Sequence, residues 1–351
     1  MLDEKTCAWL IDNADAPIKY RVARELLQDE KSAKKIESEL LEHKEVQKWF
    51  ANLKPNEPVQ YSIGYLEHGS FDFCLENALP KLIQLGLHGG FEQIIEAVGF
   101  YINQNNFSGI AMANLFLMAN IKNETALKYM LDRLDKLYNF AKRGIYNLYI
   151  SEEEKKKLTG IPPRWKDKNF INPEFFKSGY CYPLIYDIIG LHRLYDLNNS
   201  DVDMKINGVI NYISTDEFHN KISDGYGILI SGKYASGNPQ YHGMGWDPKY
   251  PGWFDPADYL ENFNAPKLLF FAQNISKYPH ALKTKWFDDL LNYLEKYKTK
   301  SETYIFPQKW LNESQGYAVQ GHHLSFGENK RKKNRLEIES TFYMQLIKQN
   351  I

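Results

Sequence analysis

The residues best suited to acid–base chemistry form two pairs of titratable side chains. Asp72 and Glu76 are four residues apart, so they share one face of a helix that begins near Ser70. Two carboxylates on one face suit acid–base or glycosidic reactions, although acids in a first helical turn also simply complement the helix dipole. His242 and Asp247 are the titratable groups of a segment rich in glycine and aromatic residues. We therefore predict all four as catalytic residues.

Aromatic and imidazole side chains near these groups are candidates for substrate binding. Aromatic faces stack on sugars or stabilise cations, and glycines let a backbone approach a ligand closely. Several buried tyrosine hydroxyls together indicate a polar cavity or network, with core filling and a self-packed loop as the alternatives. The predicted substrate-binding residues are His68, Tyr180, Tyr182, Tyr186, Tyr241, Trp246, Trp253, His322 and Arg335.

The elements that position these residues are predicted to be helices. Apolar residues recur at helical spacing along most of the chain, and Pro55 and Pro58 break the first helical region. The stretches with this spacing are 18–50, 75–83, 91–102, 110–119, 127–137, 182–189, 202–213, 268–275, 286–294 and 335–348.

The helices read as pairs, which favours a layered all-α architecture in one domain over 1–351. The first member of a pair tends to be apolar on more than one face, and the second is amphipathic. This pattern predicts an (α/α)6 toroid in which the helices of 1–54 close against a last helix at 335–349. An open, armadillo-like α-solenoid is the alternative.

Three insertions interrupt the helices, at 150–175, 219–263 and 299–334. Loops longer than about fifteen residues are uncommon unless they are functional or disordered. The aromatic content of these segments argues against disorder. We expect 219–263 and 299–334 to be loops that lie over a central, aromatic cavity.

Composition excludes several classes of protein. The 43 basic and 44 acidic residues balance, which argues against nucleic-acid binding, and the chain contains no apolar run of about eighteen residues that would span a membrane. The three cysteines are odd in number and widely spaced, and the acidic start differs from a secretion signal. These features predict a cytoplasmic protein that acts on a small molecule. They do not predict an oligomeric state.

Two segments carry a family resemblance. The opening CAWLIDNADAPIKYRVARELL and the ending GENKRKKNRLEIESTFYMQLIK resemble the two ends of bacterial proteins grouped with the terpenoid cyclase and protein prenyltransferase toroids, and they cover under a fifth of the chain. The resemblance implies an (α/α)6 toroid with an axial cavity. The chain lacks the Asp-x-Asp-Asp motif of class II terpene cyclases and the QxxxGxW repeat of squalene cyclases. The fold therefore carries over, and the reactions do not.

The prenyltransferase resemblance also raises the question of zinc. Those enzymes bind zinc through an Asp-x-Cys pair and a distant histidine, and Asp72-Phe73-Cys74 has this spelling, with His322 or His323 as the distant residue. The pair lies too early in the chain for that family. We therefore predict no cofactor and no metal, and keep zinc as the alternative.

These observations predict an enzyme of the terpenoid cyclase and prenyltransferase type in fold. It would act by acid–base chemistry on a small organic substrate, isoprenoid-like or carbohydrate, in the aromatic cavity. A carbohydrate lyase or hydrolase with an α/α barrel is one alternative. A ligand-binding or scaffold protein without catalysis is the other.

Overall fold

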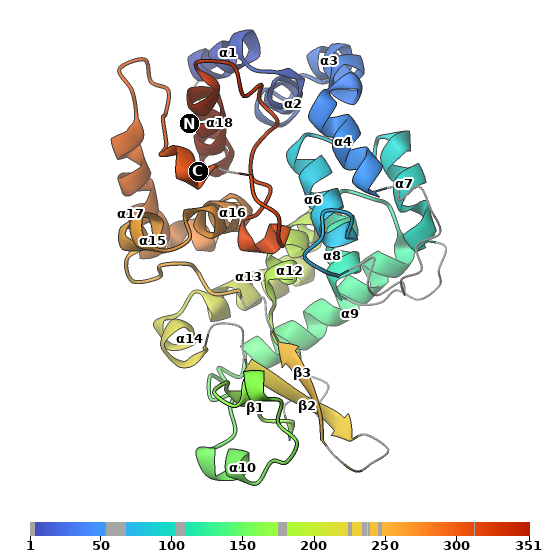
Figure 1. Cartoon of the computed structure of the whole chain (residues 1–351), viewed down its shortest axis with the longest axis vertical. Coiled ribbons are helices and arrows are strands. Elements are labelled where there is room, and N and C mark those ends of the chain that lie inside the picture. Colours follow the sequence, from blue (N-terminus) through green and yellow to red (C-terminus); the bar gives the residue numbers. More distant parts are fainter. Residues whose placement is uncertain are drawn as a thin grey trace.

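The protein is mostly helical and also contains one small sheet (Figure 1). The computed structural model describes residues 4–53, 68–102, 110–174, 181–223, 227–233, 237, 239–244, 248–311 and 313–351. The helical content confirms the expected class, whereas the strands were not predicted. Within the described ranges, no helix has the length and apolar character needed to cross a bilayer.

The described α-helices follow one another along the whole chain. They are α1 (Glu4–Asn13), α2 (Ala16–Arg21), α3 (Glu30–Glu42), α4 (Lys44–Leu53), α6 (Leu75–Gln84), α7 (Glu92–Ile102), α8 (Ile110–Met118), α9 (Glu124–Ala141), α10 (Glu152–Lys156), α12 (Ile185–Gly190), α13 (Ser200–Ile213), α14 (Asp216–Lys221), α15 (Pro256–Asn262), α16 (Ala265–Ile275), α17 (Lys285–Leu294) and α18 (Arg335–Lys348).

Short helical segments of other types join these helices. They are the π-helical η1 (Val22–Leu26) and the 3-10 segments η2 (Pro163–Trp165), η3 (Leu191–Leu197), η4 (Ala281–Lys283), η5 (Glu295–Tyr297), η6 (Gln308–Trp310) and η7 (Ala318–Gln320).

A series of largely buried helices forms the centre of the molecule. Helix α6 packs against α8, α8 against α12, α12 against α16, and α16 against α18, while α1 contacts α18 (Figure 1). All residues of α18 from Ile338 to Ile347 are buried. The first and last helices of the chain therefore lie together in one core.

Amphipathic helices pack on the outside of this series. Helix α9 contacts both α8 and α13 and begins where the Asn123 side chain accepts a hydrogen bond from the Ala126 amide at 2.8 Å. Its buried positions, Ala126, Met130, Leu134 and Leu137, recur at three- and four-residue intervals. This arrangement agrees with the predicted alternation of buried and amphipathic helices.

The sheet and helix α15 occupy much of the expected loop 219–263, so this expectation was wrong in part. Strand β1 (Phe170–Ile171) pairs in parallel with β2 (Gly227–Lys233), and β2 pairs antiparallel with β3 (Pro239–Met244). Phe170, Ile228 and Tyr241 form a small apolar cluster separate from the main core. Glycines are typical of turns, so the glycine-rich sequence of this segment predicted a loop where the structure has short strands.

Residues 313–328 pack between α6 and α16. Segment η7 contacts both helices, and a Cβ atom added at Gly321 would lie 2.3 Å from the Lys267 amide nitrogen at the start of α16. Only glycine permits such a close approach of two backbones. A cavity of about 40 Å³ remains beside this segment, smaller and more polar than the aromatic cavity that we expected.

Candidate acid–base site

The turn 68–74 is held against the start of α6 by one buried amide. The Asn77 side chain donates to the Gly69 and Phe71 carbonyl oxygens at 2.8 and 2.9 Å, and its Oδ1 accepts from the Ala318 amide at 2.9 Å. One residue of α6 therefore joins this turn to the segment 313–328. The side chains that follow are positioned on these three elements.

Glu76 is the centre of the site. Its side chain is 1% exposed, and Oε1 accepts from the Gly69 amide at 2.6 Å and lies 2.7 Å from His68 Nδ1. The Tyr186 hydroxyl, at the start of α12, donates to Oε2. A buried carboxylate needs several hydrogen bonds to be stable, and these three donors supply them.

The proton affinities in this group follow from the shared carboxylate. The hydrogen bond to Glu76 raises the pKa of His68, although partial burial acts in the opposite direction. Burial and the neighbouring Glu76 carboxylate raise the pKa of Tyr186 well above its ordinary value. Tyr186 therefore remains a proton donor, while the shared carboxylate favours the protonated form of the His68 imidazole.

His68 is accessible from solvent although its partner is buried. Its side chain is 52% exposed, and its ring lies 5.6 Å from the ring of Tyr317. An imidazole with one nitrogen on a buried carboxylate and an accessible ring is suited to general acid–base catalysis. The arrangement can therefore deliver a proton to, or take one from, a molecule bound beside Tyr317.

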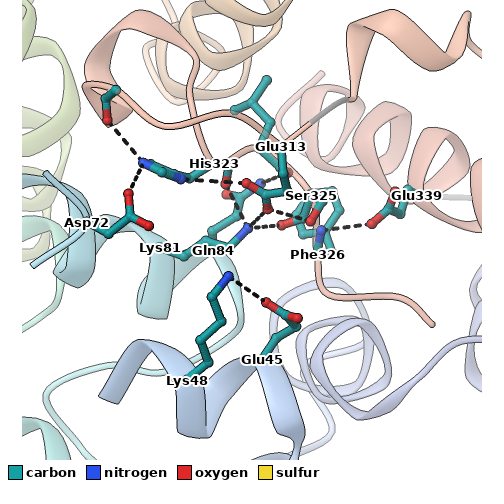
Figure 2. A network of polar contacts seen from close by, with 12 residues as sticks. Glu45, Lys48, Asp72, Lys81, Gln84, Glu313, His323, Ser325, Phe326 and Glu339 are labelled. Atoms are coloured by element: carbon teal, nitrogen blue, oxygen red, sulfur yellow. Dashed lines mark hydrogen bonds and ion pairs between the residues drawn. The ribbon is translucent and has the colours of Figure 1, made fainter. Parts of the chain in front are cut away.

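A second imidazole lies between two acids beside this group. Figure 2 shows His323 with Asp72 on one side and Glu313 on the other. Its Nε2 lies 3.0 Å from the Gly316 carbonyl oxygen and 3.7 Å from Asp72 Oδ1, and its Nδ1 lies 3.6 Å from Glu313 Oε2. The ring packs edge-on against Trp49 of α4, with centroids 4.8 Å apart.

Lys81 anchors this second group from inside the core. Its buried Nζ donates to Glu313 and to the carbonyl oxygens of His323 and Ser325, the last two at 2.9 and 2.6 Å (Figure 2). Burial acts to raise the pKa of Glu313, but the Lys81 charge and the hydrogen bonds to this carboxylate outweigh burial and lower the pKa. Glu313 is therefore ionised, and Lys81 fixes the segment that carries His323.

Arg335 lies on the far side of this network. Its Nη2 is 3.2 Å from Oε2 of the buried Glu339, whose Oε1 accepts from the Phe326 amide at 3.1 Å. Burial raises the pKa of Glu339 to about 7, against the lowering effect of Arg335. The arrangement gives Arg335 a structural partner within the core.

The remaining predicted residues are distributed over the molecule. Helix α6 begins at Leu75 and not near Ser70, so Asp72 lies in the preceding turn and faces His323, while Glu76 faces His68 and Tyr186. Tyr182 is buried against Phe140. His322 Nδ1 lies 2.8 Å from Ser314 Oγ.

Other predicted residues lie away from the acid–base site. His242 is exposed on β3, which Figure 1 places apart from α6, and Tyr241 donates to the Thr159 carbonyl oxygen at 2.7 Å beneath the sheet. Tyr180, Trp246 and Asp247 lie outside the described residues.

Trp253 lines a separate surface cleft of about 350 Å³. Its ring stacks on His219 with centroids 4.2 Å apart, and its Nε1 donates to Asp216 at 2.7 Å. Phe254 and Phe263, both largely exposed, also line this cleft. The cleft is therefore an aromatic surface rather than part of the acid–base site.

Lys81, Glu313 and Tyr317 belong to the site and were not predicted. Lys81 lies five residues after Glu76, within an apolar helical stretch. A lysine within such a stretch is the only feature of the sequence that could have indicated its role. His323 was considered as a zinc ligand and as an inward-facing imidazole, with a structural histidine as the alternative. In the described part of the chain, no three His, Cys, Asp or Glu side chains converge as metal ligands do, and burial raises the pKa of the Cys74 thiol to about 11.

Comparison with known proteins does not assign this chain to a family. No family model, no curated protein and no solved structure matches the chain.

Proposed function

We propose that this protein is an acid–base enzyme whose active site is formed by His68, Glu76 and Tyr186, with Asp72 and His323 beside them. The observation that carries the proposal is one buried carboxylate shared by a buried tyrosine hydroxyl and a half-exposed imidazole. In this proposal the helices form a ring of hairpins like those of the terpenoid cyclase and prenyltransferase toroids. The contacts from α6 through α8, α12 and α16 to α18, and of α1 with α18, support the ring.

The substrate that suits this site best is a small polar molecule, and we favour a carbohydrate. The accessible part of the site presents His68, Asp72 and the Tyr317 ring, which offer hydrogen-bonding groups beside an aromatic face. An isoprenoid substrate needs a dry, apolar cavity around its reacting carbons, whereas the His68 imidazole is half-exposed to solvent and the Asp72 carboxylate is partly exposed beside it. In this mechanism His68 transfers the proton, and Glu76 orients the imidazole and stabilises its charged form.

A panel of substrates tests the proposal. Purified protein is incubated with 4-nitrophenyl glycosides, with polyuronides and with farnesyl diphosphate, followed by absorbance for the first two and by product chromatography for the last. We expect turnover of a carbohydrate, and a loss of about 100-fold or more in kcat/KM in His68→Gln and in Glu76→Gln. His280→Gln, a histidine remote from the site, is the matched control and should keep full activity.

The results that would contradict the proposal are distinct. Turnover that is unchanged in His68→Gln would exclude this imidazole as the acid–base group. Turnover of farnesyl diphosphate alone, or of nothing in the panel, would overturn the carbohydrate assignment.

The Trp253 cleft favours ligand binding without catalysis as a second candidate function. Its exposed aromatic rings, Phe254 and Phe263, flank the cleft and are joined there by Asp255 and Asp258. Trp253→Phe, with tryptophan fluorescence followed during addition of mono- and disaccharides, tests this candidate. A saturable change in the wild type that is lost in the variant would support it, and equal responses in the two would contradict it.

A further inference from the structure

Positive charge gathers at the opposite ends of the buried helices from Glu76 and Tyr186. Arg21 ends α2, Arg24 lies in η1, Arg193 lies in η3 just after α12, and Lys277 follows α16 by two residues. We name these four residues the Lys277 cluster. Because α6 is ten residues long, its two ends are about 15 Å apart, which separates this cluster from the acid–base site.

The cluster has more cations than carboxylates. Glu25 Oε1 and Oε2 accept from Arg21 Nε and Nη2 at 2.9 and 2.7 Å. Asp196, which is 68% exposed, lies 3.9 Å from Arg193 Nη1. Glu25 and Asp196 are the carboxylates at ion-pair distance from the four basic residues in the described part of the chain, and these direct pairs leave an excess of two positive charges when Lys277 is protonated.

Lys277 lacks a carboxylate at ion-pair distance in the described part of the chain. Its Nζ donates to the Asn274 side-chain oxygen at 3.3 Å, which is a long contact to a neutral group. Burial, together with the charges of Arg193 and Arg21, lowers the pKa of Lys277 to about 7, and Glu25 opposes this only in part. The described residues therefore compensate the Lys277 charge only in part.

One further nitrogen atom of this region, Arg193 Nε, is buried without a hydrogen bond to any described residue. Leaving a buried polar group unpaired costs about 1–3 kcal/mol, so such atoms point to a ligand that completes them. Lys277 and Arg21 also border the cavity of about 40 Å³, which has room for ordered water or a small anion.

Helix dipoles explain only part of this arrangement. The C-terminal end of a helix favours a nearby cation, and Arg21 Nη1 donates to the Gln84 carbonyl oxygen at the end of α6 at 3.0 Å. Arg21 therefore has a structural role. The weak contact of Lys277 and the unpaired Arg193 Nε are not accounted for in this way.

We propose that the Lys277 cluster binds a phosphate dianion, either inorganic phosphate or the phosphate group of a small monoester. The excess of two positive charges matches a dianion, whereas a single carboxylate would compensate half of it. Lys277 Nζ and Arg193 Nε are the donors. The site lies apart from Glu76 and Tyr186, although its cavity also borders Lys81 and His323, and the proposal does not depend on the proposed reaction.

Calorimetric titration with inorganic phosphate and, separately, with glycerol 3-phosphate tests the proposal at constant ionic strength. We expect wild-type protein to bind one of the two probes, and Lys277→Met to bind it about tenfold more weakly or not at all. Lys285→Met, which removes an exposed lysine of α17, is the matched control and should bind as the wild type does. Binding of phosphate itself indicates a free anion, and binding of glycerol 3-phosphate alone indicates a monoester ligand.

Two further measurements distinguish a loss of phosphate binding from a loss of folding. Arg193→Gln removes the second donor from a partly exposed side chain and should also weaken binding. The thermal unfolding midpoint in phosphate-free buffer confirms that each variant is folded. Failure of both probes to bind the wild type, or binding of equal strength in Lys277→Met, would overturn the proposal.

Discussion

His68 Nδ1 lies 2.7 Å from Oε1 of Glu76, a carboxylate that is almost completely buried. The pair joins a turn of the chain to the first turn of α6, and Tyr186 completes it from α12. The same contact stabilises the turn and prepares an accessible imidazole for proton transfer. Stability and proposed chemistry therefore depend on the same atoms.

This pair should make stability depend on pH. The pKa of His68 is raised in the folded state, so its stabilising effect is fully present below the unfolded value of about 6.5 and is lost as the pH rises through the folded value. We expect His68→Gln to lose more unfolding free energy relative to the wild type at pH 5.5 than at pH 8.5. Urea denaturation at the two pH values measures this, and an equal loss at both would contradict it.

Substitution of Lys81 should lower the unfolding free energy more than most other substitutions in the core. Lys81→Met leaves the buried Glu313 carboxylate and two carbonyl oxygens without their donor, and we expect a loss of about 3–5 kcal/mol in unfolding free energy. Lys35→Met, on the exposed face of α3, should change stability by less than about 0.5 kcal/mol. Similar losses in the two variants would show that the network does not hold residues 313–328.

Glu339 should make the protein less stable as the pH rises, which is the opposite of the effect of an acid whose pKa is lowered by folding. Its pKa of about 7 in the folded state lies above the ordinary value, so the stability that it contributes is present at low pH and is lost as the pH rises from about 4.5 through 7. Glu339→Gln should therefore gain stability relative to the wild type between pH 5 and pH 8. Glu337→Gln, on the same helix, is the control for thermal unfolding measured across this range. A gap between Glu339→Gln and wild type that stays constant with pH would contradict the expectation.

Much of the helical structure could be predicted from the sequence because each amphipathic helix carries its own pattern. Met130, Leu134 and Leu137 are spaced by three and four residues, and all three are buried on one side of α9. The strands were missed because β1 has two residues and the β2–β3 pair lies in a glycine-rich segment. Such short strands depend on partners elsewhere in the chain.

The candidate site was predictable only where its parts are near in sequence. His68, Asp72 and Glu76 lie within nine residues and were all predicted, although the late start of α6 sends the two acids toward different histidines. Lys81 and Glu313 are separated by 232 residues, so no local spacing indicates their contact. Their pairing is a product of the packing of 313–328 between α6 and α16.

The most direct test of the account is the titration of the His68 imidazole by NMR in the wild type and in Glu76→Gln. We predict a pKa above 6.5 in the wild type and a lower value in the variant, because the amide of glutamine does not carry the charge that favours the protonated ring. Asp72→Asn, which changes the neighbouring acid, should leave the His68 titration close to that of the wild type. Identical His68 titrations in the wild type and in Glu76→Gln would contradict the account.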